Sequence, residues 1–510
     1  MNNPEFKALC NVFHNLLNKT ADIHIPSRLL EVIYYNLNLL NLKKFEEYLE
    51  EKRIDHEHES ILDAYVYSFQ KLLSERDISG FPLFVRFLKE DRASFLKDKL
   101  STIPRTAGLL FPASQNIEPY KSYLTSMEFP PHELAKVIVE TALNIEKNIV
   151  NSSKSTPDDR VYTALHLSRS MAEISRTVYS MNINMEDLHV KLKCKNYIPT
   201  YRCILLKAIK LADTVIETAI VPRAPVLGYI QIMSTVTRTD LWKDNEFLSK
   251  IKAKLDDAWN VLMNSNYSQL NKLDALSLEG SFYYNTGWFY ATNKKFDLAG
   301  ERFRKAFRSF FILERNNEKV PLGFLRGVYV SLWNYYLMWF NHDLEAGGFI
   351  KEDKLQDAEC WGNMTRIIVN DPSLQSLIWK LGIHAFYAYA LSLTASQLLG
   401  KEVKSDPVVL SIAPERIKVT TQIIVNLLNN KVNSALDMSK KAGLKPVIME
   451  LLNCIQGKRK CPQLNADPWE IIEKYRLTIR ELPLLEYIIN KLDDREETLK
   501  GIALLVLYTL

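Results

Sequence analysis

The chain has 510 residues, of which 65 are lysine or arginine and 60 are aspartate or glutamate, so its formal net charge is only +5. So small a charge on so long a chain gives a weak field and does not by itself indicate nucleic-acid binding. Hydrophobic residues make up 47% of the chain, a composition that excludes disorder throughout. The length exceeds that of one ordinary core, which predicts several domains or one elongated stack.

Residues that favour turns are scarce along the whole chain. There are 16 glycines and 20 prolines, and no Asn-Gly or Asp-Gly pair occurs. Antiparallel sheets depend on such pairs for their tight hairpins, whereas long runs without glycine or proline favour helices. The sequence therefore predicts an all-α protein.

Apolar residues recur at three- and four-residue spacing along most of the chain, which predicts amphipathic helices. We expect an N-terminal helical region at 1–100, a proline-containing connection at 101–131 and a helical-repeat region at 132–510. The N-terminal region could form a separate domain. The predicted helices include Phe6–Leu17, Leu29–Leu42, Ile61–Leu73, Phe81–Lys97, Leu134–Val150, Arg160–Met181, Tyr201–Ile220, Phe247–Met263, Leu273–Asn293, Phe296–Glu314, Lys354–Val369, Pro414–Asn429, Val432–Ala442, Val447–Ile455, Trp469–Glu481, Leu484–Leu492 and Leu499–Leu510.

Prolines and small polar residues predict where these helices stop and start. Pro104 and Pro112 fall in the predicted connection, and Pro222 with Pro225 marks a second hinge. The cluster at 155–159, Ser-Thr-Pro-Asp-Asp, combines a capping hydroxyl with acidic residues for the first turn, so we expect a helix to begin there.

The six cysteines show neither metal-site spacing nor the regular spacing of a disulfide framework. Reduced thiols are the simplest interpretation, and they are typical of cytosolic or nuclear proteins. The polar N-terminus lacks the basic and apolar regions of a signal peptide. We therefore expect an intracellular protein, in the cytoplasm or the nucleus. The cysteines are Cys10, Cys194, Cys203, Cys360, Cys454 and Cys461.

Two apolar stretches, Leu322–Phe340 and Ile378–Leu399, approach the length of a membrane span. Arg326 interrupts the first and His384 the second, and ionisable groups are costly in hydrocarbon. We expect both to be central helices of a stack rather than membrane-inserted segments, because helices covered on several sides are apolar all round.

Residues 280–313 combine small and aromatic residues at a spacing suited to two nested helices. In the first predicted helix Tyr283, Gly287 and Tyr290 alternate large and small side chains. The second predicted helix does the same with Phe296, Ala299, Phe303 and Ala306. Small residues at the contact let two helix axes approach to about 8–10 Å.

This segment resembles one tetratricopeptide repeat, a helical hairpin of about 34 residues. Outside it, Leu381–Ala385 repeats only the core of the first helix. A single hairpin cannot cover its own apolar face, so the resemblance implies stacked antiparallel hairpins that form a TPR-like α-solenoid. It also implies a non-catalytic scaffold or adaptor that binds a protein or peptide in a concave groove.

The family's groove-facing positions fall on Ser281, Tyr284, Trp288 and Ala291. Tyr284 and Trp288 would serve as amphipathic anchors for a partner. Alternatively, the chain's own C-terminal helix fills the groove and buries both rings. Tyr284 and Trp288 also stand where chaperone-tail-binding relatives place lysine and asparagine, which argues against a carboxylate clamp.

Six basic residues of the same hairpin could form a cationic strip for acidic partners or phosphates. Asp297 and Glu301 offset part of this charge, so ordinary solvation is the alternative. Gly457–Lys460 is a second short basic run, which could be a nuclear address, a phosphate contact or a solvated loop. The strip comprises Lys294, Lys295, Arg302, Arg304, Lys305 and Arg308.

Motifs of metal binding and catalysis are missing. Asp55–Glu59 has metal-type side chains, but alternate helical residues diverge and no His-Glu-x-x-His occurs. Glycine-rich phosphate loops and nucleophile elbows are also absent. We expect no metal, no cofactor and no catalytic residues. Two alternatives stay open: a helical-repeat protein that binds nucleic acid, and an all-α enzyme with an unrecognised site.

Overall fold

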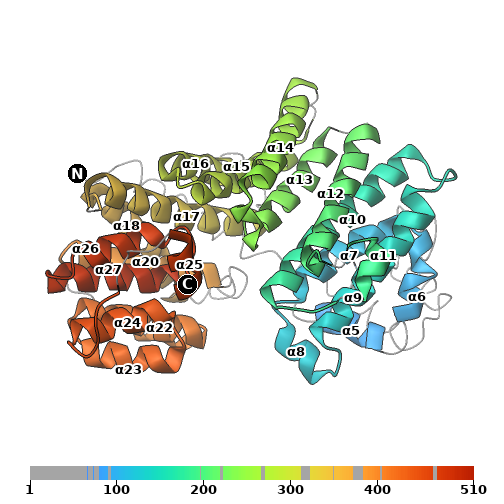
Figure 1. The fold of residues 1–510 in the computed structure, drawn as a ribbon. Coiled ribbons are helices and arrows are strands. Elements are labelled where there is room, and N and C mark those ends of the chain that lie inside the picture. Colours follow the sequence, from blue (N-terminus) through green and yellow to red (C-terminus); the bar gives the residue numbers. More distant parts are fainter. Residues whose placement is uncertain are drawn as a thin grey trace. The chain divides into compact units, whose positions relative to one another are not determined.

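A computed structural model gives the fold of most of the chain (Figure 1). Within the described residues the protein is all-α, with 22 α-helices, no strand and tightly packed helix pairs, which confirms the predicted class. The helices predicted before residue 66 lie outside these residues. The described residues are 66, 70, 73, 80–89, 93–185, 187–195, 197–218, 222–265, 270–311, 322–348, 350–370, 383–401, 405–462 and 468–510.

The chain divides into two compact units, and the division falls between Leu270 and Asn271. Unit 2 lies within His24–Leu270, and the described part of unit 1 is Asn271–Leu510. Residues 101–131, predicted as a connection, carry two helices of unit 2, α7 (Arg105–Asn116) and α8 (Lys121–Ser126). The predicted division into three segments therefore does not coincide with this one.

Unit 2 is built around its longest helix, α10 (Pro157–Ser180), which packs against α7, α12 (Thr200–Thr218) and α13 (Arg223–Val236). The predicted start of α10 is confirmed, because the Thr156 hydroxyl accepts a hydrogen bond from the Asp159 amide at 3.1 Å. The other helices of unit 2 are α5 (Gly80–Phe87), α6 (Ala93–Lys97), α9 (Pro131–Ile145), α11 (Leu188–Leu192) and α14 (Asn245–Ser265).

The proline signals of unit 2 are confirmed in part, because Pro104 directly precedes α7 and Pro222 directly precedes α13, whereas Pro112 lies inside a helix. Pro225 lies in the first turn of α13, where backbone amides lack a helical acceptor and proline is tolerated. Pro112 lies inside α7, where the ring cannot donate to the Gly108 carbonyl. The helix continues nonetheless, and Leu109, Leu110 and Ala113 beside this proline are all buried. Tertiary packing therefore outweighs the local signal of a stop.

Unit 1 begins with three successive helices, α15 (Lys272–Thr292), α16 (Phe296–Phe311) and α17 (Leu322–Gly347). α15 packs on α16 and α16 on α17, and the three-residue turn between α15 and α16 makes that pair an antiparallel hairpin. A second close pair joins α18 (Glu352–Asn370) and α20 (Ile383–Leu398). The remaining helices are α21 (Pro407–Ile412), α22 (Glu415–Leu428), α23 (Val432–Ala442), α24 (Pro446–Ile455), α25 (Pro468–Tyr475), α26 (Leu482–Asn490) and α27 (Arg495–Tyr508).

Glycines lie where the first helices of unit 1 touch. A Cβ atom on Gly287 would lie 3.0 Å from the Phe303 ring, so the predicted close contact at Gly287 is confirmed. Two turns along the hairpin, the Phe310 ring lies against both Gly280 of α15 and Gly327 of α17. Large aromatic rings of α16 therefore fill the space that these glycines leave open.

The C-terminal helix α27 lies in the core of unit 1, where it packs against α20, α22, α24 and α26 (Figure 1). Its last residue, Tyr508, donates a hydrogen bond from its hydroxyl to the Leu337 carbonyl at 3.0 Å, and the same hydroxyl lies 2.9 Å from Asn341 Oδ1. Both partners belong to α17, so hydrogen bonds between residues far apart in the sequence hold α27 against α17.

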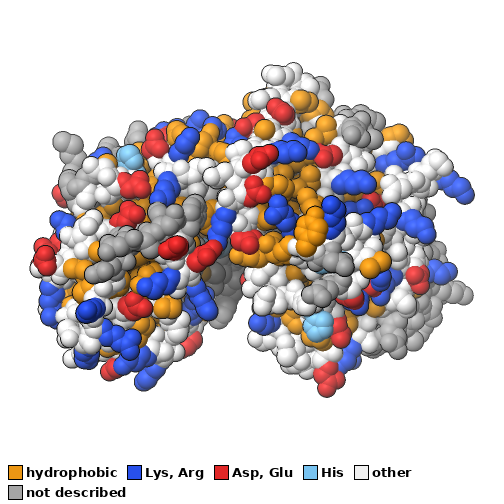
Figure 2. Space-filling view, viewed as in Figure 1, with side chains coloured by type: hydrophobic (Ala, Val, Ile, Leu, Met, Phe, Trp, Pro, Cys, Tyr) orange, Lys and Arg blue, Asp and Glu red, His pale blue; other side chains and the backbone are white. Residues whose placement is uncertain are grey.

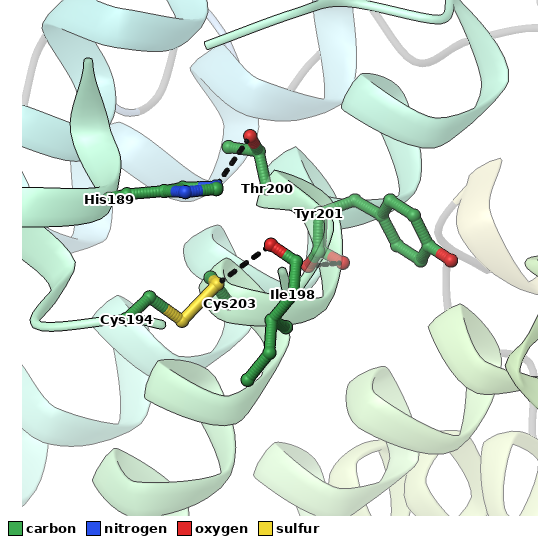
Figure 3. The surroundings of a disulfide bond; sticks show 7 residues. His189, Cys194, Ile198, Thr200, Tyr201 and Cys203 are labelled. Atoms are coloured by element: carbon green, nitrogen blue, oxygen red, sulfur yellow. Dashed lines mark hydrogen bonds between the residues drawn. A yellow bond between two sulfur atoms is a disulfide. The ribbon is translucent and has the colours of Figure 1, made fainter. Parts of the chain in front are cut away.

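Four cysteines form two disulfides, so the prediction of reduced thiols is wrong for them. Cys194 follows α11 and bonds to Cys203 in the first turn of α12, with Cα atoms 6.0 Å apart (Figure 3). His189 lies beside this bond, with Nε2 3.1 Å from the Thr200 hydroxyl (Figure 3). Two cysteine pairs with separations of nine and seven residues do not resemble a regular disulfide framework, which is why the sequence did not reveal them.

The second disulfide joins Cys454, at the end of α24, to Cys461. It closes the loop that carries the exposed basic run Gly457–Lys460. Disulfides are rare in cytosolic and nuclear proteins, so the two bonds weigh against the predicted location, which stays a prediction. Among the described residues no helix is long and apolar enough to cross a membrane.

The tightest helix contact provides a test of the packing. A Cβ atom on Gly362 of α18 would overlap the Ala388 carbonyl oxygen and the Cβ of Ser392, both on α20. We expect Gly362→Ala to lower the free energy of unfolding by about 2 kcal/mol or more, because backbone cannot move aside as a side chain can.

The matched control is Gly228→Ala in α13, where a Cβ atom would meet its nearest neighbour at an ordinary 3.5 Å. This change should leave stability unaltered or raise it by about 0.5–1 kcal/mol, the usual helical preference for alanine. Urea unfolding of both variants is the measurement. Equal effects of the two substitutions would contradict the close approach of α18 and α20.

Candidate functional site

The predicted partner-binding residues lie on α15, which begins where Asn271 accepts a hydrogen bond from the Asp274 amide at 2.8 Å. Tyr284 and Trp288 are one turn apart and both half-buried. Their rings meet the Phe303 ring of α16 edge-on, with centroids 5.5 and 5.8 Å away. Phe303 is fully buried and therefore fixes the position of both rings.

Other parts of unit 1 contact the outer sides of these rings. Asn334 of α17 donates from Nδ2 to the Tyr284 hydroxyl at 3.4 Å. The Arg480 guanidinium, from the segment between α25 and α26, lies 4.8 Å from the centre of the Trp288 ring. Within unit 1, α17 and the segment that holds Arg480 therefore contact the two rings, while the groove and its filling by the C-terminal helix stay predictions.

Three polar atoms around these rings are buried without a hydrogen-bond partner: Trp288 Nε1, Asn285 Oδ1 and Asn334 Oδ1. Each asparagine donates through Nδ2 to the carbonyl one turn earlier, at 2.8 Å, which leaves its Oδ1 unused. A buried polar atom without a partner costs about 1–3 kcal/mol. The site therefore holds one donor and two acceptors that are unsatisfied within the protein.

The other two predicted contact residues differ in exposure. Ser281 is half-buried, and its carbonyl accepts the hydrogen bond of Asn285 Nδ2. Ala291 is fully buried and has no exposed surface to offer a partner. Asn285 and Asn334 were not among the sequence candidates. Asn285 shares the α15 face with Ser281 and Trp288 at helical spacing, which is a signal that the sequence contained.

Several residues of the predicted basic strip contact aromatic rings or a carboxylate of their own hairpin. Arg302 lies over the rings of Tyr283 and Tyr290 at 5.5 and 5.6 Å. Lys305 lies 5.4 Å from the Tyr283 ring, and Arg304 forms an ion pair with Glu301 at 2.6 Å. The strip is therefore interrupted, and its exposed members are Lys294, Lys295, Lys305 and Arg308.

Charged side chains of both signs alternate on the face drawn in Figure 2, with hydrophobic ones between them. Large apolar side chains of unit 2 are exposed on several helices, among them Val190 on α11, Leu206 and Ile216 on α12, and Val261 and Met263 on α14. Single exposed apolar residues are common on folded proteins, so these do not by themselves indicate a binding surface.

No cluster of three or more potential metal ligands occurs among the described residues. The predicted metal-type run Asp55–Glu59 lies outside them. One carboxyl group of unit 1 has an unusual environment: burial raises the pKa of Asp357, on α18, to about 6. The ammonium of Lys354 opposes this shift, and the carboxylate of Asp353 adds to it.

Comparison with protein-family models, with curated proteins and with solved structures gave no match. The tetratricopeptide resemblance thus depends on the residues of the α15–α16 hairpin alone.

The Asp357 environment predicts a pH dependence. Since its folded pKa of about 6 lies above the ordinary aspartate value of 3.8, the folded state favours the neutral acid, and this stabilisation is lost as the pH rises from about 4 to about 6. Asp357→Asn should therefore raise the urea midpoint at pH 7 and leave it nearly unchanged at pH 3.5. An equal effect at both pH values would contradict the raised pKa.

Proposed function

We propose that unit 1 is a non-catalytic scaffold that binds an extended peptide segment of a partner protein over Tyr284 and Trp288. The observation that supports this proposal is that three polar atoms beside the two rings have no hydrogen-bond partner within the chain: Trp288 Nε1, Asn285 Oδ1 and Asn334 Oδ1. In this proposal the helix pairs of unit 1 continue the α15–α16 hairpin as a TPR-like stack.

The proposal follows from what these atoms can bind. Asparagine oxygens accept hydrogen bonds and the indole N–H donates one. An extended peptide presents N–H and C=O groups in alternation, so one backbone segment could satisfy both kinds of atom. Because all three atoms are fully buried in this structure, the peptide would first have to displace a covering side chain such as Arg480. The recognition would then involve the partner's backbone, with the Tyr284 and Trp288 rings offering apolar contact for its side chains.

The aromatic residues add binding energy at low entropic cost. Phe303 already holds the Tyr284 and Trp288 rings in place, so a partner would not need to order them. Half-buried tyrosine and tryptophan side chains are typical of the residues that dominate binding energies at interfaces. Arg480 lies over the Trp288 ring, so a partner would share this ring with it or displace it.

The structural observations favour this function over the two alternatives. A nucleic-acid-binding surface requires a continuous basic face, whereas Arg302, Arg304 and Lys305 contact tyrosine rings or a carboxylate of their own hairpin. An enzyme requires converging ionisable groups. The polar groups beside Tyr284 and Trp288 are instead mainly neutral amides and an indole, which suit binding better than catalysis.

Trp288→Phe is the sharpest test, because it removes the N–H donor and retains an aromatic ring. The wild-type chain and the variant are used as baits for quantitative affinity purification with mass spectrometry. A protein retained by the wild type is then titrated against both forms. We expect about tenfold weaker binding by the variant, the effect of one hydrogen bond lost from a buried site.

The control is Lys295→Ala, in the exposed turn between α15 and α16, which should bind the same partners with wild-type affinity. Unfolding midpoints of the three proteins should agree, so that weaker binding reflects the site. Recovery of the same partners with the same affinities by Trp288→Phe would overturn the proposal.

A further inference from the structure

The chain between the start of α11 and the start of α12, in unit 2, exposes two large apolar side chains. Val190 is 83% exposed and Tyr197 is 77% exposed, the largest fractions among the large hydrophobic side chains that the structure describes. The two residues are only seven positions apart in the sequence. Such exposure is ordinary for one isolated side chain, but two of them in one short segment indicate a surface that another body covers.

Lysines stand between these two side chains, at alternate positions of the sequence. Lys191 forms an ion pair with Glu140 at 2.6 Å. Lys193 and Lys195 are exposed, and neither forms an ion pair with another residue that the structure describes. Lys195 lies instead 5.7 Å from the centre of the Tyr197 ring. Residues 190–195 and 197, here named the lysine loop, thus combine exposed apolar groups with two positive charges that are not paired within the described chain.

The lysine loop is held in place at its middle and at both ends. The Cys194–Cys203 disulfide ties its middle to the first turn of α12, with Cα atoms 6.0 Å apart (Figure 3). Directly before the loop, the buried His189 places Nε2 3.1 Å from the hydroxyl of Thr200, which follows the loop (Figure 3). The Cys194 amide also donates to the His189 carbonyl at 2.9 Å. Binding would therefore cost little ordering of the backbone.

We infer that the lysine loop docks on the surface of a lipid bilayer that contains anionic lipids. Val190 enters the boundary between the headgroups and the acyl chains. Tyr197 lies at the level of the headgroups, where its ring is in apolar surroundings and its hydroxyl stays hydrated. Lys193 and Lys195 lie against the lipid phosphates, which supply the negative charge that the described chain does not.

A bilayer fits the lysine loop better than a protein partner does. A specific protein interface buries about 800 Å² on each side around a closely packed apolar centre. Val190 and Tyr197 are separate projecting side chains with charged residues between them, so they offer no such centre. A bilayer needs no complementary shape, because its interface accepts apolar side chains and lysines side by side.

Co-sedimentation of the full chain with lipid vesicles tests the inference. One set of vesicles is phosphatidylcholine alone, and the other is equal parts of phosphatidylcholine and phosphatidylserine. We expect the wild type to bind the mixed vesicles about tenfold more tightly or better, because each lysine near an anionic surface contributes about fivefold. This preference should shrink as the salt concentration rises.

Two double variants separate the charged contribution from the apolar one. Lys193→Gln combined with Lys195→Gln should weaken binding to the mixed vesicles about tenfold or more. Val190→Ser combined with Tyr197→Ser should weaken it by about tenfold as well, because the apolar contact is lost. All four side chains are exposed, so both variants should unfold at the wild-type urea midpoint.

Matched controls come from other exposed residues of unit 2. Lys210→Gln combined with Lys250→Gln removes the same charge, and Val261→Ser removes an exposed apolar side chain of α14. Neither control should change binding to the mixed vesicles.

Three outcomes would overturn the inference: no binding of the wild type to the mixed vesicles, equal binding to both kinds of vesicle, or equal losses in the variants and their controls. Soluble poly-glutamate supplies negative charge without a lipid phase. If poly-glutamate bound as tightly as the mixed vesicles and the Val190→Ser, Tyr197→Ser variant bound like the wild type, an acidic protein would replace the bilayer as the partner.

Discussion

The structure of unit 1 depends on the close approach of helix pairs at positions that have no side chain. Backbones can come this near only where one partner is glycine, and the opposing helix then fills the space with a large group. Replacing one of these glycines with alanine would place a methyl group in space that another side chain or backbone already fills. The contacts pair Gly287 with Phe303, Gly280 and Gly327 with Phe310, Gly300 with Trp339, Gly362 with Ser392, and Gly501 with Ile488.

This packing also determines where polar groups are left over. Phe303 fills the space beside Gly287 and at the same time holds Tyr284 and Trp288, and the side-chain oxygens of the neighbouring Asn285 and Asn334 have no donor within the chain. In unit 2, α10 is surrounded by other helices, and the guanidinium of Arg169 lies over the Phe111 ring of α7. The peptide site proposed for unit 1 follows from its combination of a rigid apolar framework with a small unsatisfied polar patch.

Much of the fold could be predicted from periodicity, because helices such as α23 (Val432–Ala442) have strong apolar faces and clear ends. The proline signal misled at Pro112, where long-range packing decides the outcome, whereas Pro104 and Pro222 do mark the start of a helix. The disulfides and the division near residue 270 depend on contacts between distant residues, which local patterns do not contain. Likewise, Trp288 could be selected by its place in the hairpin, but Asn334 and Arg480 reach it from other helices.

The most direct test of the central claim is a double-mutant cycle between Gly280 and Phe310. A Cβ atom on Gly280 would lie 2.6 Å from the Phe310 ring. Gly280→Ala should therefore destabilise the wild type but cost little in a Phe310→Leu background, which gives a coupling energy of about 1–3 kcal/mol in urea unfolding. The same loss in both backgrounds would show that the ring does not occupy the space left by Gly280, and would contradict the account.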